Sequence, residues 1–348
     1  MTAKAIDWKK WKSWKRSVAQ LKERREHLMN PENYSRRFDK LVDGLHMVTT
    51  DLPQYLDQPE VNGLMASTQQ RLWDVMNWLS LQYSAGAEVA QMAEVWPYAL
   101  DWAEEYAGFS HRFNESPDAY GRVCAHVSLS TESYWIVALR LVCFGLLTGN
   151  ASQMPRVMAI LDYANDEKDG LLERLVSPFM AGRGTPPDKC LRHLPYRKLL
   201  KVFAAAPDKR PPLMVKYLEE WYEASRREPY VNQHDSYRFE GYWSWEAAAT
   251  AWMLDIDDST FRDMPFYPRD LVDFARALDG AVVGSPSPPS RPNVPANHPC
   301  PETGWWFTPA KAGSRRHFTQ GSIMPDVEGS AYGATFWQWS PDQSAPTL

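Results

Sequence analysis

A helical repeat of apolar residues, which runs from Pro31 to about residue 280 and then stops, constrains the fold more than any other feature. Within it, the stretch RLWDVMNWLSLQY places on one helix face the apolar residues Leu72, Val75, Met76, Leu79 and Tyr83. Residues 281–300 then contain six prolines, which neither continue a helix nor sit in a central strand. The pattern predicts a mainly α fold, in which a multi-helix bundle body is followed by an extended linker.

The composition changes again after this linker. Residues 301–348 are rich in Gly, Trp and Thr, which is typical of short strands joined by turns. We therefore expect a small β-rich C-terminal appendage. The predicted domains are a basic, Trp-bearing N-terminal helix over 1–29, a helical body over 30–280 with halves 30–150 and 151–280, the Pro-rich linker over 281–300, and the β-rich module over 301–348.

The N-terminal stretch is basic, since residues 1–25 hold nine Lys or Arg and only two acids. Trp8, Trp11 and Trp14 recur at every third position, which predicts one helix over the first 28 residues, ended by an Asn-Pro pair. We expect the Trp stripe to pack on the body and the Lys/Arg face to be solvated. The alternative is a basic helix that lies on a membrane surface, which would make the chain a membrane-surface or scaffold protein.

Two features bear on the cellular compartment. The longest apolar run, YWIVALRLVCFGLL, contains Arg140 and is shorter than the roughly 20 residues that span a bilayer, and no secretory signal is visible. The four cysteines suit a reducing environment better than a disulfide framework or a zinc site, because they are scattered at Cys124, Cys143, Cys190 and Cys300. We expect a cytoplasmic protein with no stable membrane association.

The densest acidic stretch is LDIDDSTFRDMPFYPRDLVDFAR, residues 254–276, with six aspartates. Asp255, Asp257 and Asp258 could gather a divalent cation, but the sixth and twelfth positions lack the Gly and Glu that an EF-hand loop needs. Helix caps and an acidic binding face are the better interpretations, and the two can coexist. Because the sequence has no nucleophile elbow or phosphate-binding glycine loop, we predict no catalytic residue, metal or cofactor; an enzyme with a carboxylate-lined cleft is the alternative.

Acidic residues gather in two stretches that also carry aromatic residues. Residues 51–120 hold eleven acids against two Arg, and residues 240–280 hold nine acids against three Arg. A negative face repels the phosphates of nucleic acids. It suits a basic protein partner, since opposite potentials speed encounter and aromatic side chains anchor the complex.

Residues 222–276, with the Trp before them, contain a pattern that resembles the C-terminal half of PoNi-type immunity proteins. The pattern is a Trp-Tyr pair, a His, Gly-Tyr-Trp before Glu-Ala-Ala-Ala, then Ile-Asp-Asp-Ser, Arg-Asp, and Tyr-Pro-Arg-Asp-Leu-Val. In this chain its parts are Trp221-Tyr222, His234, Gly241–Trp243, Glu246–Ala249, Ile256–Ser259, Arg262-Asp263 and Tyr267–Val272. Residues 300–340 resemble a Trp-rich C-terminal module of related immunity proteins through, among others, Gly304-Trp305-Trp306 and Trp337-Gln338-Trp339.

The resemblance implies a helical antitoxin that neutralises a bacterial type VI secretion toxin, most often a DNase, by direct binding in the cytoplasm and without catalysis. Its expected partner is the cognate effector toxin, a nuclease domain, and it binds no nucleic acid itself. We expect part of the aspartates to hold the fold through caps and Asp–Arg pairs. The predicted partner-binding residues are Asp101, Glu104, Glu105, Glu240, Tyr242, Asp257, Asp258, Asp263 and Tyr267.

Overall fold

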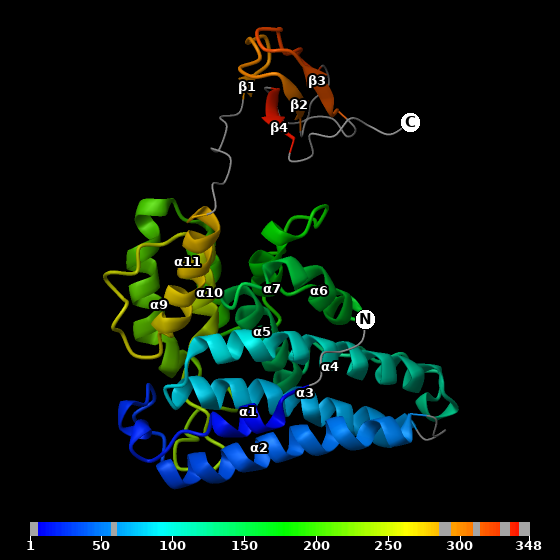
Figure 1. The fold of residues 1–348 in the computed structure, drawn as a ribbon, viewed down its shortest axis with the longest axis vertical. Coiled ribbons are helices and arrows are strands. Elements are labelled where there is room, and N and C mark those ends of the chain that lie inside the picture. Colours follow the sequence, from blue (N-terminus) through cyan, green and yellow to red (C-terminus); the bar gives the residue numbers. More distant parts are fainter. Residues whose placement is uncertain (1–5, 57–60, 285–293, 309–313, 328–334, 341–348) are drawn as a thin grey trace. The chain divides into compact units, whose positions relative to one another are not determined.

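In the computed structural model, the described residues are 6–56, 61–284, 294–308, 314–327 and 335–340. The chain divides into two compact units, one up to Leu278 and one from Asp279 onward. The helices are α1 Trp8–Ser13, α2 Pro31–Asp51, α3 Val61–Ser84, α4 Val89–Glu115, α5 Glu132–Leu147, α6 Met154–Asp162, α7 Gly170–Val176, α8 Leu200–Ala204, α9 Arg210–Ala224, α10 Trp245–Met253 and α11 Arg269–Gly284 (Figure 1). The predicted mainly α fold is confirmed.

Three long helices, α2, α3 and α4, lie side by side and form one layer of the helical unit (Figure 1). The Asn-Pro pair that we expected to break a helix also starts α2. The Asn30 side chain accepts hydrogen bonds from the backbone N–H groups of Glu32 at 2.8 Å and Asn33 at 3.1 Å. These bonds satisfy donors that have no partner inside the helix, and Pro31 lacks the N–H that would otherwise need one.

The N-terminal residues do not form the single predicted helix. α1 ends at Ser13, whose hydroxyl donates to the Lys10 carbonyl at 2.6 Å, and a short 3₁₀ turn, η1 (Gln20–Glu23), follows. The chain leaves the helix because side-chain contacts override local propensity: Trp11 is buried, with its ring stacked 5.4 Å from that of Trp78 in α3.

The expected packing of the Trp stripe on the body is confirmed. The buried Trp11 ring is therefore not available to a membrane surface. Nor does any helix in the described ranges have the length and apolarity needed to cross a bilayer.

α5 is largely buried, and α10 packs directly against it. Ala247, Ala248, Ala249 and Ala251 of α10 are fully buried, and their small side chains allow the two helices to pack closely. α5 is close to α4 as well, because a Cβ atom at Gly145 would overlap the Trp96 ring.

The second unit contains a four-stranded antiparallel sheet in the order β1-β4-β2-β3. The strands are β1 Val294–Pro295, β2 Gly304–Phe307, β3 Arg316–Phe318 and β4 Phe336–Trp339. It has a small core of its own, made of Val294, Cys300, Trp306, Met324 and Trp337. The β-rich character predicted for this region is confirmed.

The segment predicted as a linker is shorter than expected at both ends. α11 continues to Gly284, and β1 begins at Val294. Pro295 is tolerated because β1 is an edge strand, where a missing N–H removes no bond from the middle of the sheet. The rest of the predicted linker, residues 285–293, lies outside the described residues.

Candidate partner-binding surface

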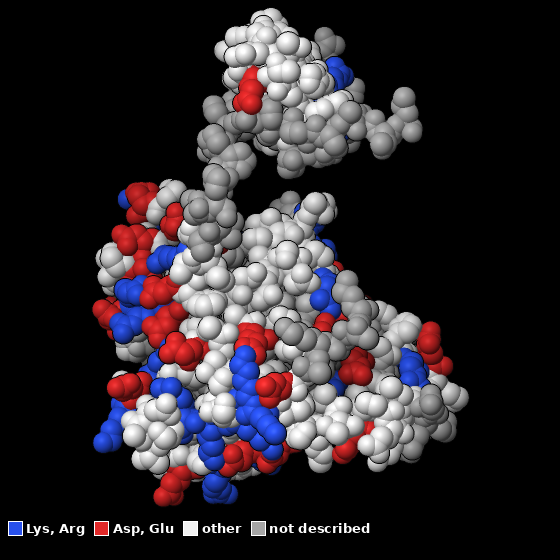
Figure 2. All heavy atoms as spheres, in the orientation of Figure 1, with Lys and Arg blue, Asp and Glu red and all other residues white. Residues whose placement is uncertain are grey.

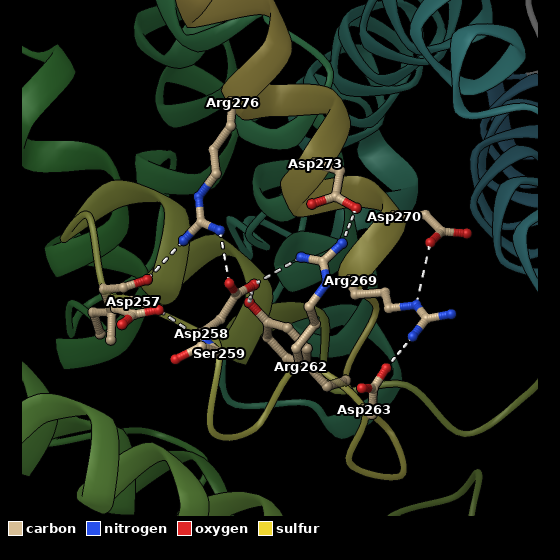
Figure 3. A network of polar contacts seen from close by, with 11 residues as sticks. Asp257, Asp258, Ser259, Arg262, Asp263, Arg269, Asp270, Asp273 and Arg276 are labelled. Atoms are coloured by element: carbon tan, nitrogen blue, oxygen red, sulfur yellow. Dashed lines mark hydrogen bonds and ion pairs between the residues drawn. The ribbon is translucent and has the colours of Figure 1, made fainter.

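Asp258 is the centre of the acidic segment (Figure 3). Its buried carboxylate accepts hydrogen bonds from Arg276 Nη1 at 2.9 Å and from the Tyr267 hydroxyl at 3.1 Å, and it lies 3.5 Å from Arg262 Nη1. Arg276 also donates to the Ile256 carbonyl at 2.6 Å. These bonds tie α11 to the loop that precedes it.

Other aspartates of this segment are paired with arginines as well. The further pairs are Arg262–Asp273, Arg269–Asp263, Arg269–Asp270 and Arg25–Asp270. Together with Asp258 and Arg276, four aspartates meet four arginines, so these groups carry no net charge. Figure 2 agrees, because acidic and basic side chains are interleaved on the side of the helical unit that carries α9.

Asp257 has a different role from its neighbour Asp258. It is exposed, and its side chain accepts a hydrogen bond from the backbone N–H of Ser259 at 3.0 Å (Figure 3). This bond holds the pKa of the Asp257 carboxyl below its usual value. The prediction that Asp–Arg pairs hold this part of the fold is thus confirmed, whereas Asp257 stabilises a turn between α10 and α11 and does not cap a helix.

Four of the nine predicted partner-binding residues have side chains that are almost completely buried in the helical unit. Glu240 is 10% exposed and bonds Arg37 at 2.6 Å and Arg140 at 3.4 Å. The exposed fractions of Tyr242, Asp258 and Tyr267 are 2%, 5% and 3%. In this structure these four side chains stabilise the fold, and their polar groups form hydrogen bonds or ion pairs within the helical unit.

Gly241, between two of these residues, fixes the chain in a conformation that other residues rarely adopt. Its φ is +99°, and a Cβ atom would overlap the hydroxyl of Ser84 and the indole of Trp243. The Ser84 hydroxyl donates to the Glu240 carbonyl at 2.6 Å and accepts from Trp243 Nε1 at 2.8 Å. The Gly-Tyr-Trp part of the sequence pattern is therefore a close contact with the end of α3.

Three other predicted residues, Asp101, Glu104 and Glu105, lie together on α4. They line a groove of about 1220 Å³, bounded by α4 residues 96–105, by Trp8 of α1, by the 3₁₀ turn η2 (Leu52–Tyr55), and by Arg156 of α6. We call it the α4 groove. A second hollow, of about 680 Å³, is lined by three more of the predicted residues, Tyr242, Asp263 and Tyr267.

The charges of the α4 groove are arranged around two arginines that the sequence did not single out. Arg156 donates to Glu104 Oε2 at 2.6 Å and to Asp101 Oδ1 at 2.8 Å, and these bonds raise the pKa of its guanidinium. Arg71 bonds Glu105 and is only 2% exposed, and burial lowers the pKa of Arg71. Three carboxylates thus face two guanidinium groups, which leaves the groove with one net negative charge.

The side of the groove near Arg71 is aromatic. The Arg71 guanidinium lies 4.9 Å from the centre of the Trp102 ring, an attractive cation–π contact. Tyr98 and Trp8 also line the groove and are only partly buried. The groove therefore offers aromatic faces next to half-exposed carboxylates, which can recognise a positively charged group.

The described residues give this surface no evident catalytic machinery. Burial raises the pKa of Asp74, Asp169, Glu228 and Glu246, and none of these carboxyl groups lines the α4 groove. Within the described ranges, no three His, Cys, Asp or Glu side chains are grouped so as to hold a metal ion. The arrangement is suited to binding by charge and shape.

Comparison with known proteins identifies the C-terminal half of the helical unit. Residues 167–271 match the family described as PoNe immunity proteins (PoNi), C-terminal. The crystal structure of protein PA2201 from Pseudomonas aeruginosa has the same fold, with a TM-score of 0.64 and 17% sequence identity over 79% of this chain and 100% of that chain. No curated protein matches the sequence significantly. Residues 167–271, which span α7 to the start of α11, are therefore similar to the C-terminal part of the PoNi family of immunity proteins.

Proposed function

We propose that the protein is an immunity protein that binds a cognate toxin and neutralises it. The observation that carries this proposal is the match of residues 167–271 to PoNe immunity proteins. The matched segment contains Asp258, Arg262, Asp263 and Arg269 of the Asp–Arg network, whose charges form pairs within the protein. Neutralisation by such a protein depends on the surface of a folded unit, and one protein molecule inhibits one toxin molecule without turnover.

We propose further that the toxin is a DNase delivered by a type VI secretion system, and that the protein acts in the cytoplasm. The resemblance of residues 222–276 to PoNi-type proteins supports the first part. The cysteines support the second, since all four are free thiols, as is usual for proteins in reducing compartments.

Two routes of inhibition fit a binding protein of this kind. Acidic side chains could cover the DNA-binding surface of the toxin and mimic phosphates, or the helical unit could lodge beside the active site and block its closure. Exposed charges are screened by salt, whereas apolar contacts are not. A steep loss of affinity between low and high salt would support phosphate mimicry, and a flat response would support occlusion.

The direct test is a calorimetric titration of the full chain against the toxin domain encoded next to its gene, combined with a DNA-cleavage assay. We expect nanomolar one-to-one binding that abolishes cleavage. An unrelated DNase serves as the control and should stay active. If the neighbouring toxin domain neither binds nor loses activity, the proposed function is wrong.

A further inference from the structure

We propose that the toxin docks in the α4 groove and on the apolar ridge beside it, and that the groove receives a basic side chain flanked by an apolar one. This inference rests on the proposed immunity function and specifies its surface. The proposed docking surface differs from a purely acidic patch, because its aromatic and apolar side chains would determine how long the complex survives. The PoNi-matched segment, residues 167–271, does not include this surface.

The groove continues into a second hollow across η2. That hollow measures about 360 Å³ and is lined by Met47, Leu52, Tyr55 and Leu64, among others. Leu52 lines both hollows. The two hollows therefore meet at η2, and we call the exposed residues Met47, Tyr55 and Leu56 beside it the apolar ridge.

This ridge carries large apolar side chains in solvent. Met47 is 59% exposed, Tyr55 45% and Leu56 41%. Single exposed apolar residues are ordinary, but a group of them beside a polar rim is typical of protein-binding sites. Tyrosine is among the residues that most often contribute strongly to binding energy.

The charges of the groove favour a positively charged partner. Arg156 is shared between Asp101 and Glu104, whose side chains are 50% and 40% exposed. One guanidinium serves two carboxylates, so a second cation can approach the same pair without displacing the first. A polyanion such as DNA or an acidic membrane is repelled by this arrangement, whereas a nuclease must carry basic side chains to hold its own substrate.

The Asp–Arg network of Figure 3 is a weaker candidate for the same role. Its four paired aspartates are balanced by four arginines, so these pairs add no attraction for a cation. The combination of an unbalanced carboxylate pair with exposed apolar residues beside it selects the α4 groove.

The test compares three variants of the full chain with the wild type, using a catalytically inactive form of the toxin domain encoded next to the gene as the probe. The first variant reverses charge in the groove (Asp101→Lys with Glu104→Lys). The second truncates the ridge (Tyr55→Ala with Leu56→Ala). The third makes the same charge change on α9 (Glu219→Lys with Glu223→Lys), on exposed positions that do not line the groove.

We expect the groove variant to slow association roughly tenfold, because like charges now meet during encounter. The ridge variant should instead dissociate about tenfold faster, because truncating an apolar anchor acts mainly on the lifetime of the complex. The α9 variant should bind within about twofold of the wild type. The ridge and α9 variants should melt at the wild-type temperature, and the groove variant, which loses the half-exposed ion pairs of Arg156, should melt only slightly lower.

Two outcomes would overturn the inference, and they can be told apart. If the wild type binds and the groove and ridge variants bind equally well, or the α9 variant slows association as much as the groove variant, the docking surface is wrong and the immunity function stands. If the wild type itself does not bind the toxin domain, the proposed function and the docking surface are both wrong.

Discussion

Neighbouring residues of one type can have opposite roles, as Asp257 and Asp258 do. Asp258→Asn should lower the free energy of unfolding by about 2 kcal/mol, since it removes a charge that receives hydrogen bonds from Arg276 and Tyr267. Asp257→Asn keeps an acceptor for the Ser259 N–H and should leave the unfolding midpoint unchanged. Urea unfolding of both variants measures the contrast. Equal urea midpoints for the two variants would show that the Asp258 carboxylate contributes no more to stability than that of Asp257.

The buried carboxyl group of Glu246 should make the stability of the protein depend on pH. Its Oε1 accepts hydrogen bonds from the Tyr217 hydroxyl at 2.7 Å, Trp221 Nε1 at 2.8 Å and the Ser244 hydroxyl at 2.7 Å, and complete burial raises its pKa above the ordinary 4.5. The folded state then holds this proton more tightly than the unfolded state does. Unfolding releases the proton, so this contribution to stability is present below pH 4.5 and is lost as the pH rises through the folded-state pKa.

The variant Glu246→Gln isolates this effect because glutamine does not titrate. The difference in unfolding free energy, wild type minus variant, should fall as the pH rises from about 5 to about 7. Denaturant unfolding at several pH values measures it. A difference that stays constant or grows with pH would show that the carboxyl group of Glu246 is ionised in the folded protein.

The sequence could predict the local roles of residues but not their distant partners. The hydrogen bonds that Asp257 and Asn30 accept are local, since their backbone donors lie within three positions of them. Glu240, in contrast, is buried because Arg37 and Arg140 approach it, and the first of these lies 203 positions away. In the same way, nothing local connects Arg156 to α4, so the arginine that organises the predicted acidic residues could not be foreseen.

At the scale of elements, the contact between α10 and α5 predicts a sensitivity to side-chain volume. Ala248→Leu should destabilise the protein by roughly 1–3 kcal/mol, because Ala248 is fully buried and the added carbons must displace α5 or its neighbours. Ala277→Leu, on an exposed position of α11, is the matched control and should change little. Thermal unfolding compares the two, and an unaltered melting temperature for Ala248→Leu would contradict the tight helix contact.

Helices with a long apolar repeat were predictable from sequence, and the first element shows where that inference fails. The α3 stripe that includes Leu72, Leu79 and Tyr83 is buried as the periodicity indicates. The basic stretch at the N-terminus has the composition of a helix, but α1 ends at Ser13 and the residues after it pack along the other helices. Arg25 in this segment donates hydrogen bonds to the carbonyls of Tyr83 at 2.9 Å and Ala87 at 2.8 Å. Such contacts with another element leave no periodic mark in the sequence.

At the scale of the whole molecule, the two units have separate cores. Among the described side chains, the last buried residue of the helical core is Ala275, and the first buried residue of the sheet core is Val294. A protein domain is stabilised mainly by its own buried apolar surface. The stability of the helical unit should therefore not depend on the sheet unit.

A chain truncated after Gly284 tests this independence, since it retains all of α11. We expect it to keep the helical circular dichroism of the full chain and to unfold at the same urea concentration, because its core is complete. Truncation after Leu271 is the control: it removes Val272, Asp273, Ala275 and Arg276 and with them the ion pairs of Arg276 with Asp258 and of Arg262 with Asp273. That chain should lose stability. If the longer chain were destabilised as much as the shorter one, the sheet unit would be a stabilising part of the helical core, and the two would form a single folding unit.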